Sequence, residues 1–226
     1  GYNGSDGLNS VVKQADVVLL NYPLGAKMET PNTARNDLEY YAARTSLVGP
    51  AMTWSVFSIG YLGMGDVTKG LEYFNKGFEN NCFGPYYQWY EVPGGGGCPN
   101  FLTGAGGFLQ SLWAGLAGMR IEESPGSVDA SDASATTMSD ATISIGNVTL
   151  PPDASHLTLQ KFSFLNATLT FRFQRQGSSA TAIILVAELV EKGSTPLLLG
   201  DKELMVGRAV SFECNRGAEK LYLRAK

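Results

Sequence analysis

The chain has 226 residues, of which 44% are hydrophobic and 17% charged, with a formal net charge of −4. This composition is ordinary for a globular protein of one large or two small domains, and it excludes disorder and a basic nucleic-acid-binding surface. The longest apolar run, residues 181–190, is too short to cross a bilayer and contains Glu188. We therefore expect a soluble chain that has neither nucleic acid nor membrane as a partner.

The N-terminal half is predicted to be helical. In chain order, the apolar spacing and the start signals indicate helices over residues 32–44, after Gly49-Pro50, over 66–79 and over 106–118. Residues 124–141 are rich in Ser, Asp and Ala and poor in large apolar side chains, which is typical of a linker or exposed loop.

Beyond this segment the pattern changes to alternation. Short runs rich in β-branched and aromatic residues are separated by Gly, Pro, Asn or Ser, at 141–150, 156–165, 167–176, 181–189 and 209–215. These runs predict a small antiparallel β domain.

One carboxylate, Glu91, lies in an aromatic stretch that reads PYYQWYEV and leads into four consecutive glycines. A carboxylate can activate water or attack an anomeric carbon, and flat rings pack against the apolar face of a sugar, so the stretch indicates carbohydrate chemistry. The residues alone leave open a second interpretation, in which Glu91 is a solvated loop acid beside buried aromatic rings.

The cysteines and the single histidine restrict the chemistry further. Cys82 and Cys98 bracket Glu91 and could close a disulfide over it, whereas Cys214 lies far along the chain. No zinc-ligand spacing occurs, and His156 is the only histidine, so we predict no metal, no cofactor and no Ser-His or Cys-His nucleophile.

The expected location follows from weaker signals. The first residues lack a Met, a basic region and an apolar region, so we expect them to include no signal peptide and the chain to be a piece cut from something longer. Three N-x-Ser/Thr sequons, at Asn3, Asn147 and Asn166, are candidate glycosylation sites. Together with the cysteines, they favour a secreted or lysosomal protein.

Several blocks in a fixed order carry a family resemblance: KQADVVLLNYPLG, NDLEYYAARTSLVGPAMTWSVFSIG, WYE, NFLTGAGGFLQ and GLAGMRI. Over roughly residues 11–122 the chain resembles the C-terminal part of glycoside hydrolase family 65, above all its hydrolases, the acid trehalases and the protein-glucosylgalactosylhydroxylysine glucosidases. The resemblance implies an α+β multidomain fold. The last helices of an (α/α)6 barrel would span residues 1–124, a linker 125–140 and a β-sandwich-like domain 141–226.

The resemblance also assigns roles in an inverting α-glucoside hydrolase. Glu91 stands where these hydrolases carry the general base, and the TSLVGPAMT segment lacks the histidine and paired serines of the family's phosphorylases. Lys13 and Gln14 match a pair that hydrogen-bonds glucose hydroxyls, although taken alone they read as a polar helix end. Trp89, beside Glu91, is a candidate substrate contact.

Three points stay open at this level. Glu39 is a second candidate for the base, with a surface acid as its plainer interpretation. The general acid of the family lies upstream of the KQADVV block, so an enzyme built from this chain needs an N-terminal chain or segment as a partner. The alternative function is a non-catalytic secreted binding, storage or structural protein that retains the family fold.

Overall fold

The computed structural model of the chain describes residues 11–26, 30–123, 141–177, 182–214 and 219–226. The chain divides into two compact units, Gly1–Leu116 and Ala117–Lys226, which are taken in turn here.

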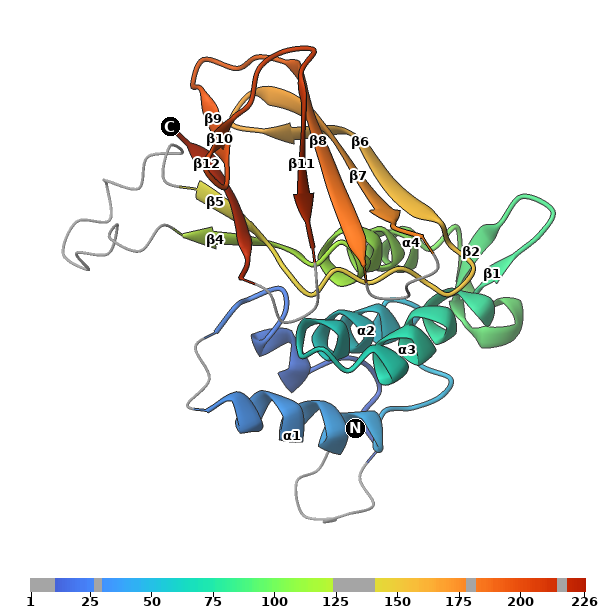
Figure 1. Ribbon diagram of the computed structural model, residues 1–226. Coiled ribbons are helices and arrows are strands. Elements are labelled where there is room, and N and C mark those ends of the chain that lie inside the picture. The colour runs from blue at the N-terminus through green and yellow to red at the C-terminus, as the bar shows by residue number, and fades with distance from the viewer. Residues whose placement is uncertain (1–10, 27–29, 124–140, 178–181, 215–218) are drawn as a thin grey trace. The chain divides into compact units, whose positions relative to one another are not determined.

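The first unit is mainly helical (Figure 1). Its elements are the 3-10 turn η2 (Val17–Leu20), the helices α1 (Pro31–Ala42), α2 (Thr53–Gly63) and α3 (Val67–Glu79), the strands β1 (Cys82–Phe83) and β2 (Gln88–Val92), the turn η3 (Pro93–Gly95), strand β3 (Gly96–Pro99), helix α4 (Leu102–Gln110) and the π-helical turn η4 (Ser111–Leu116).

The helix starts follow local capping chemistry. Thr30 precedes α1, and its side-chain oxygen accepts the N–H of Thr33 at 3.2 Å. Asp66 caps α3 in the same way, through the N–H of Lys69 at 3.2 Å. The predicted helices over 32–44 and 66–79 are confirmed to within two residues at either end. The last predicted helix instead starts earlier, at Leu102, and gives way to the π turn at Ser111.

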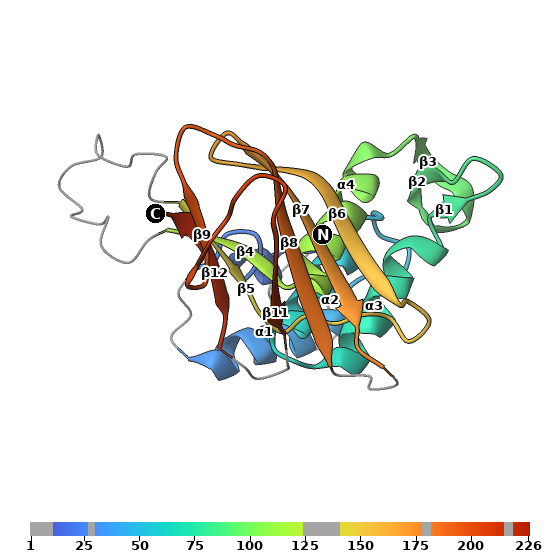
Figure 2. The same ribbon diagram turned by 45° about the horizontal axis from the view of Figure 1, so that its top comes forward.

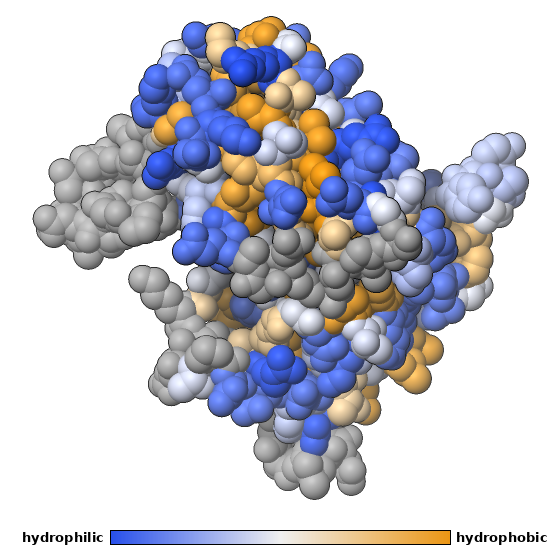
Figure 3. Space-filling model, in the orientation of Figure 1, coloured by the Kyte–Doolittle hydropathy of each residue, from blue (hydrophilic) through white to orange (hydrophobic). Residues whose placement is uncertain are grey.

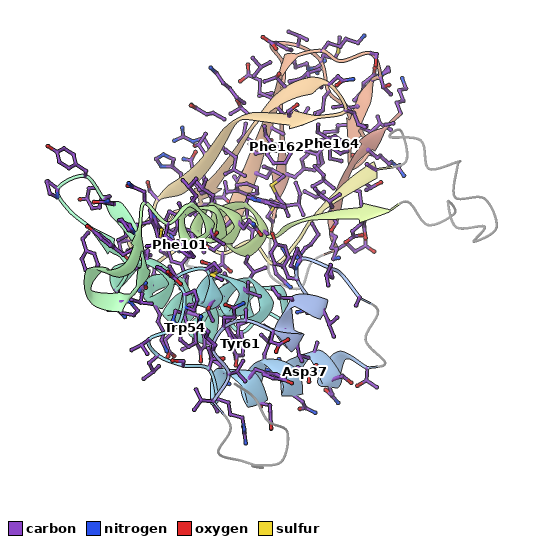
Figure 4. All side chains as sticks on the ribbon, turned by 180° about the vertical axis from the view of Figure 1, so that it is seen from behind. Asp37, Trp54, Tyr61, Phe101, Phe162 and Phe164 are labelled. Atoms are coloured by element: carbon purple, nitrogen blue, oxygen red, sulfur yellow. The ribbon has the colours of Figure 1, made fainter. Side chains whose placement is uncertain are left out.

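Helix α2 is the centre of the first unit and is buried around most of its circumference. Trp54, Phe57 and Tyr61 of α2 contact the ring of Tyr73 in α3, with centroid separations of 5.4–5.6 Å. Figure 4 shows the labelled Trp54 and Tyr61 on this helix. The burial of so many rings fixes α3 against α2 and thereby sets where the segment after α3 begins.

The second unit consists of two antiparallel sheets. One sheet has the strand order β10-β9-β12-β5-β4 and the other β11-β8-β7-β6 (Figures 1 and 2). The strands are β4 (Met119–Glu123), β5 (Ala141–Ile145), β6 (His156–Phe164), β7 (Ala167–Arg175), β8 (Ile183–Glu191), β9 (Leu197–Leu199), β10 (Lys202–Glu203), β11 (Ala209–Glu213) and β12 (Leu221–Ala225).

Alternation along β7 and β8 builds the core of this unit. In β7, Leu169, Phe171 and Phe173 are buried at every second position, and Leu185 and Leu189 follow the same rule in β8. Each of the five predicted segments contains a strand, although the strand predicted over 141–150 ends at Ile145. The fold class is α+β, with mixed helices and antiparallel sheets; the barrel portion stays a prediction.

The position of the division between the units depends on β4. Met119–Glu123 pairs with β5, so this segment belongs to the second unit although the expected helical domain extended to residue 124. The expected linker, 125–140, lies outside the described residues. Of the elements that the sequence did not predict, β9 and β10 are only three and two residues long.

Candidate active site

Glu91 lies on strand β2, in a three-stranded antiparallel sheet with the order β1-β2-β3, and not in a loop. Its carbonyl oxygen accepts the N–H of Ala51 at 2.8 Å and the side-chain amide of Asn81 at 3.3 Å. The Asn81 amide also donates to the Tyr90 carbonyl at 3.3 Å. The backbone of Glu91 is thus anchored both to the segment before α2 and to the end of α3.

Glu91 is half-buried, and within the described part of the chain its carboxylate accepts one hydrogen bond, from the N–H of Cys98, which lies 3.2 Å from Oε2. Gly97 makes this contact possible. Its φ is +71°, and a β-carbon there would stand 2.8 Å from Cβ of Glu91 and 3.1 Å from Oε2. Among the described residues, no lysine or arginine forms an ion pair with Glu91. One carboxylate oxygen is therefore held by the backbone and the other can accept a proton from water.

Lys13 and Gln14 are exposed and lie in an irregular segment before the turn η2, with Gln14 at a bend, and not at the end of a helix. Val12, just before them, is held by a pair of backbone hydrogen bonds to Arg44 and Ser46, of 2.9 and 2.8 Å. The backbone of Gly49 packs closely against that of Lys13, since a β-carbon on Gly49 would stand only 2.2 Å from the Lys13 carbonyl oxygen.

Residues 49–51 thus connect two of the predicted sites. Gly49 contacts the Lys13 backbone, and Ala51, two residues later, donates its N–H to the Glu91 carbonyl. The structure brings the backbones of Lys13 and Glu91 together through this one short segment.

Trp89 is half-buried on β2, two residues before Glu91. Its ring contacts Phe108 of α4 at a centroid distance of 5.7 Å, and a β-carbon on Gly104 would stand 3.1 Å from its Cε3. Trp89 also lines a pocket of about 420 Å³ together with Tyr86, Tyr87, Gln88, Asn100, Phe101, Leu102 and Ala105. Glu91 itself is not among the lining residues.

Glu39 lies apart from this network. It is exposed on α1, and its Oε1 pairs with Nζ of Lys69 in α3 at 3.3 Å. Burial of Tyr61, with smaller contributions from Tyr73 and the Glu39 carboxylate, raises the pKa of that phenol to about 12. Among the described residues, no hydrogen bond links Glu39 to Lys13 or Glu91, which fits its plainer interpretation as a surface acid.

The expected disulfide between Cys82 and Cys98 is not formed, because all three cysteines are free. Cys82 lies on β1 and Cys98 on β3, with β2 between them. Two strand spacings amount to about 9.5 Å, which exceeds the roughly 7 Å that a disulfide can span between α-carbons.

The sequons fall in different surroundings. Asn166 is exposed between β6 and β7, Asn147 is half-buried after β5, and Asn3 lies outside the described residues. The described residues contain no group of three or more metal-ligating side chains and no helix long and apolar enough to span a membrane.

Sequence reasoning missed the residues that support the site. Asn81 is buried and holds β2 in place, yet an isolated asparagine after a helix carries no signal of that role. Gly97 lies in the run of four glycines, which was a visible signal of unusual backbone but not of which glycine faces the carboxylate.

Comparison with known proteins finds relatives of this chain among carbohydrate-cleaving enzymes. No family model matches the chain. The protein-glucosylgalactosylhydroxylysine glucosidase of Danio rerio is 48% identical over 112 residues, 50% of this chain and 17% of the relative, and that of Gallus gallus 38% over 165 residues, 73% and 21%. The cell wall acid trehalase of Candida albicans is 35% identical over 127 residues, 51% and 12%.

The chain is therefore homologous to glycoside hydrolases, and it spans about a fifth of the length of the two glucosidases. These matches confirm the resemblance seen in the sequence blocks, and they are consistent with the C-terminal part of an enzyme like those of glycoside hydrolase family 65.

Proposed function

We propose that the chain is the C-terminal fragment or subunit of an inverting α-glucoside hydrolase, with Glu91 as its general base. The substrate class is a glucoside of the trehalose or glucosylgalactosylhydroxylysine type, as the names of the relatives suggest. The observation that supports this proposal best is the segment 49–51, which ties the backbone of Lys13 to that of the strand bearing Glu91.

The chemistry required of Glu91 is proton abstraction from a water molecule that attacks the anomeric carbon. In an inverting enzyme the two carboxyl groups stand about 6.5–9.5 Å apart, which leaves room for that water on the face opposite the leaving group. Glu91 suits the role because one carboxylate oxygen is oriented by the Cys98 N–H while the other is left for the water. A base that is held in position also needs no reorganisation during the reaction.

Lys13 and Gln14 would hold the glucose ring that is cleaved from the substrate. An ammonium group donates to hydroxyls, whereas an amide both donates and accepts, so the pair suits two neighbouring hydroxyls of a sugar. Both side chains are exposed, and Lys13 forms no ion pair among the described residues, so they are available to a ligand.

The general acid would come from an N-terminal segment or chain that corresponds to the part of the relatives this sequence does not match. The exposed apolar side chains Leu47 and Val48, which follow the segment paired with Val12, suit a covered surface better than an open one. By analogy with the Candida albicans relative, whose name places it in the cell wall, we also infer a secreted enzyme.

The test is Glu91→Gln in the assembled enzyme. This change keeps the size of the side chain and its contact with the Cys98 N–H but removes its ability to take a proton, so turnover on an α-glucoside should fall about 100-fold or more. Azide, which needs no deprotonation, should restore turnover with β-glucosyl azide as the product. Glu39→Gln is the matched control and should cost far less. Near-normal activity of Glu91→Gln in a folded enzyme would show that the base lies elsewhere.

A further inference from the structure

The pocket beside Trp89 lies in the first unit and is not used by the proposed catalytic step. Its volume of about 420 Å³ falls within the range of small-molecule sites. It is built from the turn between β1 and β2 and from the start of α4, where Figure 4 labels Phe101. None of the eight side chains that line it is charged. A ligand for this pocket should therefore be neutral.

Two tyrosines present their rings to solvent at the rim of this pocket. Tyr86 is 90% exposed and Tyr87 is 74% exposed, although aromatic rings of this size are usually largely buried. Tyr87 also has a φ of +54°, which is uncommon for a bulky residue, and its carbonyl oxygen is held by the Sγ of Cys82 at 3.2 Å. In Figure 3 the projecting hairpin tip has pale colours, those of intermediate hydropathy, and no continuous hydrophobic patch.

Two side-chain amides supply hydrogen-bonding groups in the same pocket. Gln88 donates from Nε2 to Oδ1 of Asn100 at 3.0 Å, and its Oε1 accepts the hydroxyl of Tyr90 at 3.1 Å. The amide nitrogen of Asn100 has no hydrogen-bond partner in the described part of the chain, and the residue is exposed. Asn100 has a φ of +55°, and its Oδ1 is held by Gln88. Its amide nitrogen is therefore oriented and can donate to a hydroxyl.

The pocket neighbours the proposed base along the same strand. Trp89 lines the pocket, and Glu91 follows two residues later, about 7 Å further along an extended strand. If the anomeric carbon of one sugar faces the Glu91 carboxylate, a sugar in the pocket would thus be the next sugar of the substrate or the one after it.

We propose that this pocket binds the leaving sugar of the α-glucoside, a neutral pyranose that packs on Tyr86 and Tyr87 and is hydrogen-bonded by Asn100. Flat rings cover the apolar face of a pyranose while amides satisfy its hydroxyls, so the combination of groups fits this class of ligand. That the bound sugar is the leaving group rests on the proposed function; that the pocket binds a sugar does not.

The first experiment measures binding without catalysis. The 226-residue chain is titrated with trehalose and with a glucosyl-galactose disaccharide, and binding is followed by saturation-transfer NMR. Tyr86→Ala and Asn100→Gly should each raise Kd about tenfold, the equivalent of one lost contact or hydrogen bond. Glycine at position 100 keeps the left-handed backbone accessible. Tyr222→Ala, at an exposed tyrosine of the second unit, is the control and should bind as the wild type does.

Two outcomes of this titration would overturn the proposal. One is a folded wild-type chain, checked by circular dichroism, that shows no transfer from either sugar. The other is unchanged binding by both pocket variants.

The second experiment separates the leaving sugar from the rest of the reaction. In the assembled enzyme, kcat/KM is measured for a disaccharide and for α-glucosyl fluoride, which has no leaving sugar. Tyr86→Ala should lower the ratio of the two values about tenfold. An unchanged ratio would refute the role of the pocket, and loss of association with the upstream segment would show that the hairpin is a protein interface instead. If Glu91→Gln stays active while the ratio falls, only the assignment of the base fails.

Discussion

The side-chain amide of Asn81 lies 3.3 Å from the carbonyl oxygen of Glu91, ten residues further along the chain. Asn81 is only 1% exposed, so both groups are shielded from water at this contact. A buried amide that bonds to a strand's backbone fixes the strand without touching the carboxylate itself. The position of the proposed base therefore depends on a residue at the end of α3.

We expect Asn81→Ala to lower the free energy of unfolding by about 1–3 kcal/mol, because two carbonyl oxygens, of Tyr90 and Glu91, lose a buried donor. In the assembled enzyme, Asn81→Ala should lower the activity more than Glu39→Gln does. Asn80→Ala, at the exposed neighbouring position, is the control and should change stability by less than about 0.5 kcal/mol. Chemical denaturation checks both values, and equal effects of the two variants would contradict the anchoring role.

Gly97 and Gly94 form a matched pair for testing the orientation of the Glu91 carboxylate. Both have a positive φ, of +71° and +76°, so alanine should strain the backbone by about 1 kcal/mol at either position. A β-carbon added at Gly97 would clash with the side chain of Glu91. A β-carbon added at Gly94 would have no atom within 4 Å. Turnover should therefore fall much more in Gly97→Ala than in Gly94→Ala. Equal turnover of the two variants would show that the close contact does not govern the base.

The three cysteines should differ in their reactivity towards alkylating agents. Cys98 is exposed and should be modified first, whereas burial raises the pKa of Cys82, and more strongly that of Cys214, to about 11. Since the thiolate is the reactive form, Cys214 should be modified only on unfolding. Time-resolved peptide mapping under non-reducing conditions measures this order. Recovery of a peptide in which Cys82 and Cys98 are joined would contradict the strand arrangement.

The ion pair between Glu122 and Lys220 should contribute to the stability of the second unit in a pH-dependent way. Burial raises the pKa of Glu122, but hydrogen bonds from Lys220 and Ser144 and the charge of Lys220 outweigh burial and hold it below the ordinary 4.5. Because the pKa is lowered in the folded state, the pair stabilises the fold above pH 4.5 and loses this contribution as the pH falls through the folded-state pKa.

Lys220→Gln tests this linkage. The difference in unfolding free energy between wild type and variant should be modest at neutral pH, since both groups are partly exposed, and should vanish in acid. Lys161→Gln, at an exposed lysine without an ion pair among the described residues, should show no such trend. A difference that stays constant from neutral to acid pH would rule out the linkage.

Leu47 and Val48 test the proposed N-terminal partner. They are 68% and 70% exposed, so changing both to Ser should leave the fold of this chain intact but weaken its association with the upstream segment or chain. Val190→Ser, at an exposed position of β8, is the control and should associate normally. Light scattering of the co-expressed parts measures the association. A wild-type chain that is monodisperse, active and alone would contradict the need for a partner.

The sequence by itself determined the local elements and the kind of chemistry. The helices predicted over 32–44 and 66–79 and the alternation along β7 are local patterns, so they could be predicted from neighbouring residues. Glu91 and Trp89 became candidates because an acid among aromatic rings is visible in one short stretch and because family blocks surround it. The aromatic stretch and its four glycines did not, however, indicate a strand.

Tertiary structure alone decided which distant residues support that acid. The contacts of Glu91 with Asn81 and Ala51, and of Lys13 with Gly49, join residues that are 10 to 40 positions apart, and no local pattern encodes such pairings. The same reason explains why the disulfide was wrongly predicted. Cys82 and Cys98 are suitably spaced along the chain, but the strand that carries Glu91 lies between them and keeps their α-carbons too far apart to bond.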